Sequence, residues 1–333
     1  MMFESPSRSV SDEAALQVTD LTIRYATDGG DVHAVEALNL TLKRGEVLGL
    51  IGESGCGKST AAYGMLRLLQ APGRVTRGAV RLEGEDLLSL SDRALRRRRW
   101  SKAALIPQGA MNSLNPTMTV GAMFNATMKA HGYPAGGRAR RLGELLEKVG
   151  LPLRAAELYP HELSGGMKQR VCIALAITLD PVLVIADEPT SALDVVVQRT
   201  VVQTLVAVQR ERGLSMILIG HDLGLLAQAA DRIAVMYAGR LVECAPLAEI
   251  LNAPRHPYTQ MLLDSVPTIG RQADPDRAPG GIAHDPRNPP PGCIFQLRCP
   301  MAQQLCRDRA PAWTGNLAHG VACHFAPEST VTS

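Results

Sequence analysis

A glycine-rich octapeptide, Gly52-Glu53-Ser54-Gly55-Cys56-Gly57-Lys58-Ser59, constrains the fold of this chain more than any other feature. A compact apolar run over residues 46–51 leads straight into it, and apolar residues at helical spacing follow over 58–69. A strand, a glycine loop and a helix in this order point backbone N–H groups at a phosphate, and the helix dipole favours negative charge there. The sequence therefore predicts an α/β core of the P-loop type that binds ATP or a similar ligand.

Two carboxylates further along the chain complete a site of this kind. They are Asp187 and Glu188, at the end of an apolar strand. We expect Lys58 to neutralise charge on the β- and γ-phosphates, Ser59 to bind Mg²⁺, and Asp187 to hold the same ion through water. Glu188 stands next to the metal-binding carboxylate, where it can act as general base or position the attacking water. Thr60 follows the loop and belongs to the expected nucleotide-binding set.

Composition excludes several classes of protein. The chain has 333 residues, 46% of them hydrophobic and 20% charged, which fits a globular protein of about two domains. Its net charge of +3 is too small to indicate nucleic acid as the main partner. No apolar run reaches the roughly 18 residues that a spanning helix needs, and the N-terminus has no signal-peptide pattern. We therefore expect a cytosolic chain whose role at a membrane, if any, is peripheral.

Apolar patterning divides the chain into parts. Residues 1–14 are expected to be disordered and 15–253 to form the ATPase domain. Residues of about 113–178 are rich in helical pattern, so we expect a helical subdomain inserted there. Pro- and Gly-rich composition predicts a C-terminal extension over 254–333, with a linker-like stretch at 267–291. Expected strands are 15–26, 32–42, 46–51, 80–82, 103–106, 181–186 and 215–219, and expected helices are 58–69, 138–149, 167–177 and 195–210.

The string Leu163-Ser164-Gly165-Gly166-Met167-Lys168-Gln169-Arg170 resembles the signature of ATP-binding-cassette (ABC) ATPases. The order of phosphate loop, signature and acidic strand matches that family too, and the resemblance covers about residues 15–250. It implies an ABC-type nucleotide-binding domain and roles for four more residues. These are Gln108 in a Mg²⁺-sensing glutamine loop, His221 as the switch histidine at the γ-phosphate, Asp194 in a loop that communicates across a dimer, and Tyr25 stacked on adenine.

The signature also predicts a dimer. Ser164, Gly165 and Gly166 begin an expected helix, so their N–H groups and hydroxyl form a second anion site in a chain with one phosphate loop. The family resemblance implies that ATP is sandwiched between the phosphate loop of one subunit and the signature of the other. A helix cap without a ligand is the structural alternative.

Three strings resemble the oligopeptide/dipeptide permease ATPases in particular. They are Met111-Asn112-Ser113-Leu114-Asn115-Pro116, Asp194-Val195-Val196-Val197-Gln198 and Arg255-His256-Pro257-Tyr258-Thr259. This resemblance implies an importer subunit at the cytoplasmic face of the cell membrane. Its expected partners are a second ABC ATPase subunit in a heterodimer, two transmembrane permease subunits and an extracytoplasmic peptide-binding protein, with no nucleic acid.

Four cysteines, Cys293, Cys299, Cys306 and Cys323, lie in the C-terminal extension. Their number suits a [4Fe–4S] cluster, but the spacing alone leaves a cluster, zinc and unrelated thiols open, because no two stand two to four residues apart. Resemblance to the peptide-permease ATPases, whose tails keep such cysteines for a [4Fe–4S] cluster, favours the cluster, with zinc as the alternative.

Other functions compete with peptide import. Relatives of the permease ATPases carry nickel or glutathione, so the solute is less determined than the subfamily. A soluble ABC-type ATPase acting on nucleic acid or ribosomes is a second alternative, although the chain has neither a coiled-coil insertion nor a second cassette. A regulatory subunit that binds ATP but hardly hydrolyses it is the third.

Overall fold

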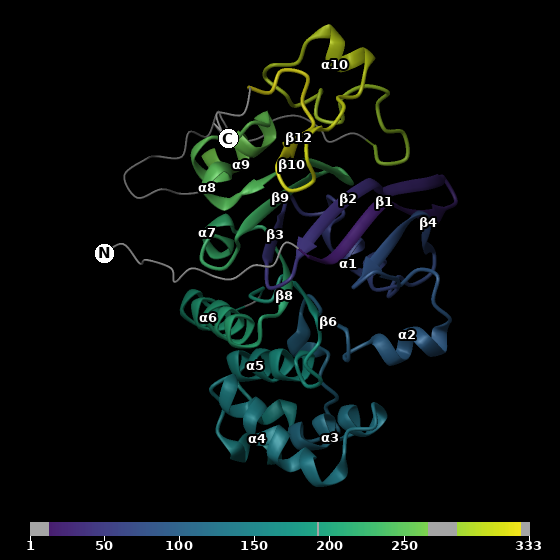
Figure 1. The fold of residues 1–333 in the computed structure, drawn as a ribbon. Helices are drawn as coiled ribbons and strands as arrows, with labels where there is room; N and C mark the ends of the chain where they lie inside the picture. The colour runs from purple at the N-terminus through teal and green to yellow at the C-terminus, as the bar shows by residue number, and fades with distance from the viewer. Residues whose placement is uncertain (1–12, 192, 266–284, 328–333) are drawn as a thin grey trace.

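The computed structural model describes residues 13–191, 193–265 and 285–327, which form two sheets with helices around them (Figure 1). The larger sheet has the strand order β11-β12-β10-β9-β3-β8-β7-β6. Its strands are β3 (Val47–Ile51), β6 (Ala103–Ile106), β7 (Leu183–Asp187), β8 (Ser215–Gly220), β9 (Arg232–Tyr237), β10 (Arg240–Pro246), β11 (Thr314–Gly315) and β12 (Gly320–Val321). The strands from β9 to β6 are parallel, whereas β10, β11 and β12 pair antiparallel at the other edge.

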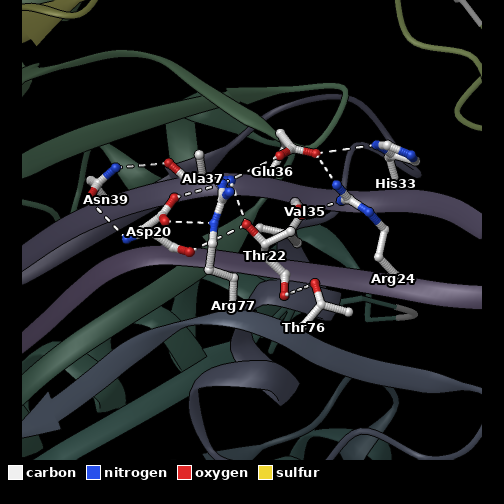
Figure 2. Close-up of polar contacts among 10 residues, drawn as sticks. All are labelled: Asp20, Thr22, Arg24, His33, Val35, Glu36, Ala37, Asn39, Thr76 and Arg77. Carbon is white, nitrogen blue, oxygen red and sulfur yellow. Dashed lines mark hydrogen bonds and ion pairs between the residues drawn. The ribbon is translucent and has the colours of Figure 1, made fainter.

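The smaller sheet is antiparallel, in the order β2-β1-β4-β5. Its strands are β1 (Ala14–Thr27), β2 (Gly30–Lys43), β4 (Gly73–Leu82) and β5 (Glu85–Asp86). A polar network crosses β1, β2 and β4 (Figure 2). In it, Arg24 of β1 pairs with Glu36 of β2, and Arg77 of β4 pairs with Asp20 of β1. Burial alone would raise the pKa of Glu36, but the hydrogen bond and charge of Arg24 hold it below its usual value.

The helices are more numerous than the sequence patterns predicted. They are α1 (Lys58–Met65), α2 (Asp92–Arg98), α3 (Val120–Ala130), α4 (Arg138–Lys148), α5 (Gly165–Ala176), α6 (Val195–Arg212), α7 (Leu223–Leu226), α8 (Leu247–Asn252), α9 (Pro257–Asp264) and α10 (Gln304–Asp308). Of these, α1 and α4 are shorter than expected, whereas α5 and α6 are slightly longer. Short 3₁₀ turns cover Ala110–Asn112, Ala135–Gly137, Leu153–Glu157 and Pro160–Glu162. Figure 1 places α3, α4 and α5 at the end of the molecule opposite to α10.

The central strands are apolar except at their ends, because both faces of the large sheet are buried. Along β7, Leu183 and Ile185 face one hydrophobic cluster, whereas Val184 and Ala186 face the other. Strand β3 alternates in the same way, with Leu48 and Leu50 in the first of these clusters. A continuous apolar run is therefore what each strand needs, as is usual for a parallel sheet covered on both sides.

Several predicted boundaries were wrong. The helix expected over 58–69 ends at Met65, because Arg67 has a φ of 50° and the N–H of Leu68 bonds back to the Tyr63 carbonyl, which closes the helix. Strand β4 starts seven residues before Val80, in a polar and mostly exposed stretch that has no apolar alternation. Strands β9 and β10 were not predicted.

The two segments expected to lack regular structure lie largely outside the described residues. Of residues 1–14, the structure describes only 13 and 14, and Ala14 opens β1. Most of the stretch 267–291 is also outside the described residues. On the C-terminal side of it, β12 pairs with β10 through Cys244 and Gly320, so the large sheet crosses the boundary expected at residue 254.

Candidate functional site

The phosphate loop joins β3 to α1, and glycine is required at two of its positions. Gly52 has a φ of 153°, and a Cβ there would stand 2.2 Å from the Met236 carbonyl oxygen. Gly57, which caps α1, has a φ of 101°, and its Cβ would stand 2.4 Å from the Ala34 carbonyl oxygen. Any side chain would push the loop off β2 and β9, so only glycine allows this close approach.

The loop is held from the small sheet by backbone hydrogen bonds. The N–H of Glu36 on β2 donates to the Gly239 carbonyl, and the N–H of Gly239 donates to the Cys56 carbonyl, both at 2.9 Å. Glu36 belongs to the network of Figure 2. The polar contacts of the small sheet thus fix the strand that supports the loop.

Lys58, Ser59 and Asp187 meet where β3 and β7 end. The buried Lys58 ammonium donates to the carbonyls of Gly52 (2.7 Å) and Glu53 (2.9 Å), so it lies across the loop. The Ser59 hydroxyl donates to Asp187 Oδ1 at 3.0 Å. Burial raises the pKa of Asp187, and the hydrogen bond from Ser59 partly opposes this.

This group fits a Mg²⁺ ion. Asp187 Oδ2 is buried and has no hydrogen-bond partner among the described residues, and it belongs to the carboxylate that Ser59 already contacts. A hydroxyl and a carboxylate oxygen are hard ligands of the kind that Mg²⁺ prefers, and a cation there would satisfy the buried oxygen.

Gln108, Glu188 and His221 form a second group beside the first. Gln108 Nε2 donates to Glu188 Oε2 at 3.1 Å, and His221 Nδ1 lies 3.5 Å from Glu188 Oε1. Glu188 has a φ of 45° and its N–H donates to the Ile219 carbonyl at 3.0 Å, so β8 holds it in a strained backbone conformation. Gln108 and His221, which follow the ends of two different strands, therefore converge on the carboxylate of Glu188, next to Asp187.

The other predicted residues lie on other elements. Tyr25 is on β1, with its ring against Gly73. Ser164 caps α5, and its hydroxyl accepts from the N–H of Met167 at 3.3 Å. Asp194 caps α6 by accepting from the N–H groups of Val196 and Val197.

The N-termini of α5 and α6 lie against each other. A Cβ on Gly166 would stand 2.7 Å from a methyl of Val197, so glycine lets the two helices approach here. Ser164 and Gly165 are exposed on this surface.

The four C-terminal cysteines line one small cavity, together with His256 and Phe295. Burial raises the pKa of Cys293 to about 11, and the thiol groups of Cys306, Cys299 and Cys323 add to the shift. No three His, Cys, Asp or Glu side chains within residues 13–191, 193–265 and 285–327 are placed to hold a single metal ion. The other three cysteines, Cys56, Cys172 and Cys244, are buried elsewhere.

Two residues that contact the loop escaped the sequence analysis. The Tyr258 hydroxyl accepts from the N–H of Glu53 at 2.9 Å, and the Arg298 guanidinium forms two hydrogen bonds of 2.8 Å with the Glu53 carboxylate. Tyr258 lies in a string noted only for its family resemblance, and Arg298 stands next to a cysteine. Their separations from Glu53, 205 and 245 residues, leave no local signal of either contact.

Comparisons with known proteins agree with this geometry. The ABC transporter family model matches residues 35–191, and the model of the oligopeptide/dipeptide transporter C-terminal region matches residues 242–306. Among solved structures, the dimeric structure of a bacterial ABC transporter cassette matches with a TM-score of 0.62 and 28% identity, over 70% of this chain and 98% of that chain. A dimeric post-hydrolysis state of the same cassette, bound to ADP and Pi, matches with a TM-score of 0.61 and 27% identity.

Curated relatives resemble the chain over nearly its whole length. A putative peptide import ATP-binding protein of Brucella abortus is 43% identical over 90% of this chain and 91% of its own length. DppD of Escherichia coli, a dipeptide transport ATP-binding protein, is 40% identical over 94% and 97%. AppF of Bacillus subtilis, an oligopeptide transport ATP-binding protein, is 41% identical over 89% and 90%.

The fold and the site define an ATPase of the ATP-binding-cassette class. Within that class, the chain belongs to the oligopeptide/dipeptide transporter family of ATP-binding proteins. Among the described residues, none of the helices has the length and apolar character needed to cross a membrane.

Proposed function

We propose that this ATPase energises the import of di- or oligopeptides across the cytoplasmic membrane, as a peripheral subunit on its cytoplasmic face. The observation that carries the proposal is the likeness to peptide transport ATP-binding proteins over 89–94% of the chain, which includes the family-specific C-terminal region. The group formed by Lys58, Ser59 and Asp187, with Glu188 next to Asp187 in the chain, supports the hydrolysis of ATP in this proposal.

In the proposed mechanism, the loop from Gly52 to Thr60 binds the phosphates of ATP. Lys58 turns its ammonium from the loop carbonyls to the β- and γ-phosphates, while Ser59 and Asp187 hold Mg²⁺. Mg²⁺ held there would neutralise charge on the phosphates. Glu188 accepts one proton of the water that attacks the γ-phosphorus, and ADP leaves as the bond between that phosphorus and the bridging oxygen breaks. Gln108 and His221 orient that carboxylate through the contacts described above, and His221 also reaches the γ-phosphate.

We propose that the catalytic unit is a dimer with a similar ATPase subunit. The signature residues Ser164, Gly165 and Gly166 would bind ATP held on the partner's phosphate loop. Val195 and Val196, which follow Asp194 at the start of α6, are 80% and 77% exposed. Apolar side chains this exposed, next to an exposed helix N-terminus, favour a protein partner over water at this surface.

Helices α3, α4 and α5 form the proposed helical subdomain, and an apolar cavity at its junction with the core suits a permease subunit. The cavity has a volume of about 500 Å³ and is lined by residues that include Leu66, Trp100, Ile106, Met118 and Met123. Pro107 and Ile106 also lead into Gln108, so a helix bound here would sit next to a residue that contacts Glu188. This arrangement would connect transport to hydrolysis.

For the C-terminal extension, we propose a [4Fe–4S] cluster on Cys293, Cys299, Cys306 and Cys323. The four thiols share one cavity, which supports a common ligand. In such a cluster each thiolate binds a different iron, so the sulfurs need not surround one point as they do around zinc. Chain purified without oxygen should therefore contain about four irons and no stoichiometric zinc. One zinc per chain would contradict the cluster.

A genetic experiment tests peptide import. The gene should be deleted in an amino-acid auxotroph of the source organism, which then depends on a dipeptide for growth. We expect growth to fail and to return with the wild-type chain but not with Lys58→Ala. Nickel and glutathione uptake in the same strains separates the alternatives, because their loss with intact dipeptide uptake would reassign the solute.

A further inference from the structure

The phosphate loop carries a negative charge of its own. The Glu53 side chain is 34% exposed and belongs to the loop that binds the phosphates of ATP, which are also negative. An unpaired carboxylate there would repel the ligand, because the interaction of two charges in a partly buried site is several times stronger than in bulk water.

Arg298 of the C-terminal segment forms an ion pair with the Glu53 carboxylate. Its Nη1 and Nη2 each donate to a different oxygen of Glu53 at 2.8 Å, in the parallel two-bond geometry that only arginine provides. The hydrogen bonds to Glu53 raise the pKa of Arg298 above its usual value. Arg298 therefore carries its positive charge under all ordinary conditions.

Packing fixes the guanidinium in place. The Arg298 side chain is only 5% exposed, and its Cζ lies 5.6 Å from the centroid of the Tyr237 ring. Tyr237 packs edge-on against Tyr258 and Phe295, at centroid distances of 4.8 and 5.1 Å. The same Tyr258 accepts the N–H of Glu53, so the aromatic group holds the loop by its backbone and Arg298 holds it by its side chain.

We propose that Arg298 is a positioning residue of the ATP site, which cancels the charge of Glu53 and so sets the affinity of the phosphate loop for ATP. The C-terminal segment that carries the cysteines would thereby act on the nucleotide, since Arg298 immediately precedes Cys299. The inference rests on the proposed binding of ATP at this loop.

Opposite effects of the two partners distinguish this role from simple structural support. Arg298→Gln leaves Glu53 charged beside the phosphates and should weaken ATP binding about tenfold, the size of one charge interaction in such a site. Glu53→Gln removes the repelling charge while Arg298 remains, and it should bind ATP more tightly than the wild type. The double variant should return to within about twofold of the wild type, since neither charge is left.

The test is a titration of the full chain with a fluorescent ATP analogue and Mg²⁺, together with the KM and kcat of hydrolysis. The effect should appear in Kd and KM and leave kcat nearly unchanged. Arg98→Gln is the matched control, because Arg98 forms a similar two-bond pair with Glu85 on β5, outside the network of Figure 2. We expect it to bind ATP like the wild type.

Two results would overturn the inference. The first is that Arg298→Gln binds ATP as tightly as the wild type, or that adding Glu53→Gln to it does not restore tight binding. The other is Glu53→Gln that binds more weakly than the wild type, a result that stands even if Arg298→Gln does not fold. A wild-type chain that binds no ATP would instead refute the proposed ATP site, so the two failures are distinguishable.

Discussion

The two glycine-rich helix N-termini of this molecule differ in how completely the chain surrounds them. At the start of α1, Lys58 is buried and Asp187 lies behind it, with the loop fastened to both sheets and to the C-terminal segment. At the start of α5, Ser164 and Gly165 are exposed. The Ser164 hydroxyl already accepts a hydrogen bond from its own helix.

The comparison of these two sites indicates that a helix N-terminus by itself is a weak anion site. Its dipole contributes about 0.3–1 kcal/mol at an exposed surface, because water screens it and competes for the N–H groups. The phosphate loop adds the buried ammonium of Lys58 and the carboxylate proposed to hold Mg²⁺, so we expect it to bind nucleotide alone. We therefore expect the signature to contribute only when a second surface covers it.

The largest effect should come from Lys58→Ala. Loss of the ammonium removes charge stabilisation at the phosphates, and we expect hydrolysis to fall at least about a thousandfold, with a matching loss of ATP binding. Steady-state phosphate release by the purified chain measures it. Lys102→Ala is the control, because Lys102 pairs with Glu83 in the turn between β4 and β5. Activity of Lys58→Ala within tenfold of the wild type would refute the assigned site.

Glu188→Gln should separate ATP binding from ATP hydrolysis at the closed site, by which we mean the phosphate-loop site at the start of α1. Without a general base, turnover should drop about a hundredfold, while Lys58, Ser59 and Asp187 still hold the nucleotide. ATP that cannot be hydrolysed should then accumulate in a dimer, which size-exclusion chromatography with ATP would detect. The exposed Glu147→Gln should behave like the wild type. Unchanged turnover in Glu188→Gln would assign the proton acceptor to another group.

Most residues of the closed site can be predicted from local sequence, whereas the distant contacts that hold the phosphate loop cannot. The strand, loop and helix around Gly52 lie together in the chain, and the acidic pair ends a recognisable buried strand. The contacts of Glu53 with Tyr258 and Arg298 span 205 and 245 residues, and no pattern in one sequence indicates such pairs. The early stop of α1 depends on a left-handed Arg67, which apolar spacing cannot reveal either.

Ser164→Ala should test the open site, by which we mean the exposed signature residues Ser164, Gly165 and Gly166 at the start of α5. If the signature works only on a partner's nucleotide, this variant should bind ATP within about twofold of the wild type but hydrolyse it about thirtyfold more slowly, because one donor to the phosphates is lost. Kd by titration and kcat at high protein concentration measure the two effects. A matching loss of ATP affinity in the isolated chain would mean that both sites bind the same nucleotide, so the open site would not need a partner.

Low pH should weaken the packing of the phosphate loop before it affects the start of α5, because it favours protonation of His256. This buried histidine caps α9 by accepting the N–H of Tyr258, the residue whose hydroxyl holds Glu53. Burial lowers the pKa of His256 from 6.5 to about 4. The unfolded chain therefore binds more protons between these values, so stability falls as the pH drops through 6.5 and the loss is complete only below the folded pKa.

From about pH 7.5 to about 5.5 this amounts to roughly 1.4 kcal/mol. Hydrogen exchange should show it as weaker protection of the Glu53 amide, with α5 unaffected. His256→Asn keeps a capping acceptor and removes the titration, so its protection should no longer depend on pH in this range. The exposed His161→Asn should keep the wild-type dependence. Equal loss of protection in α5 and at Glu53 would mean that acid acts on the whole fold and does not distinguish the two sites.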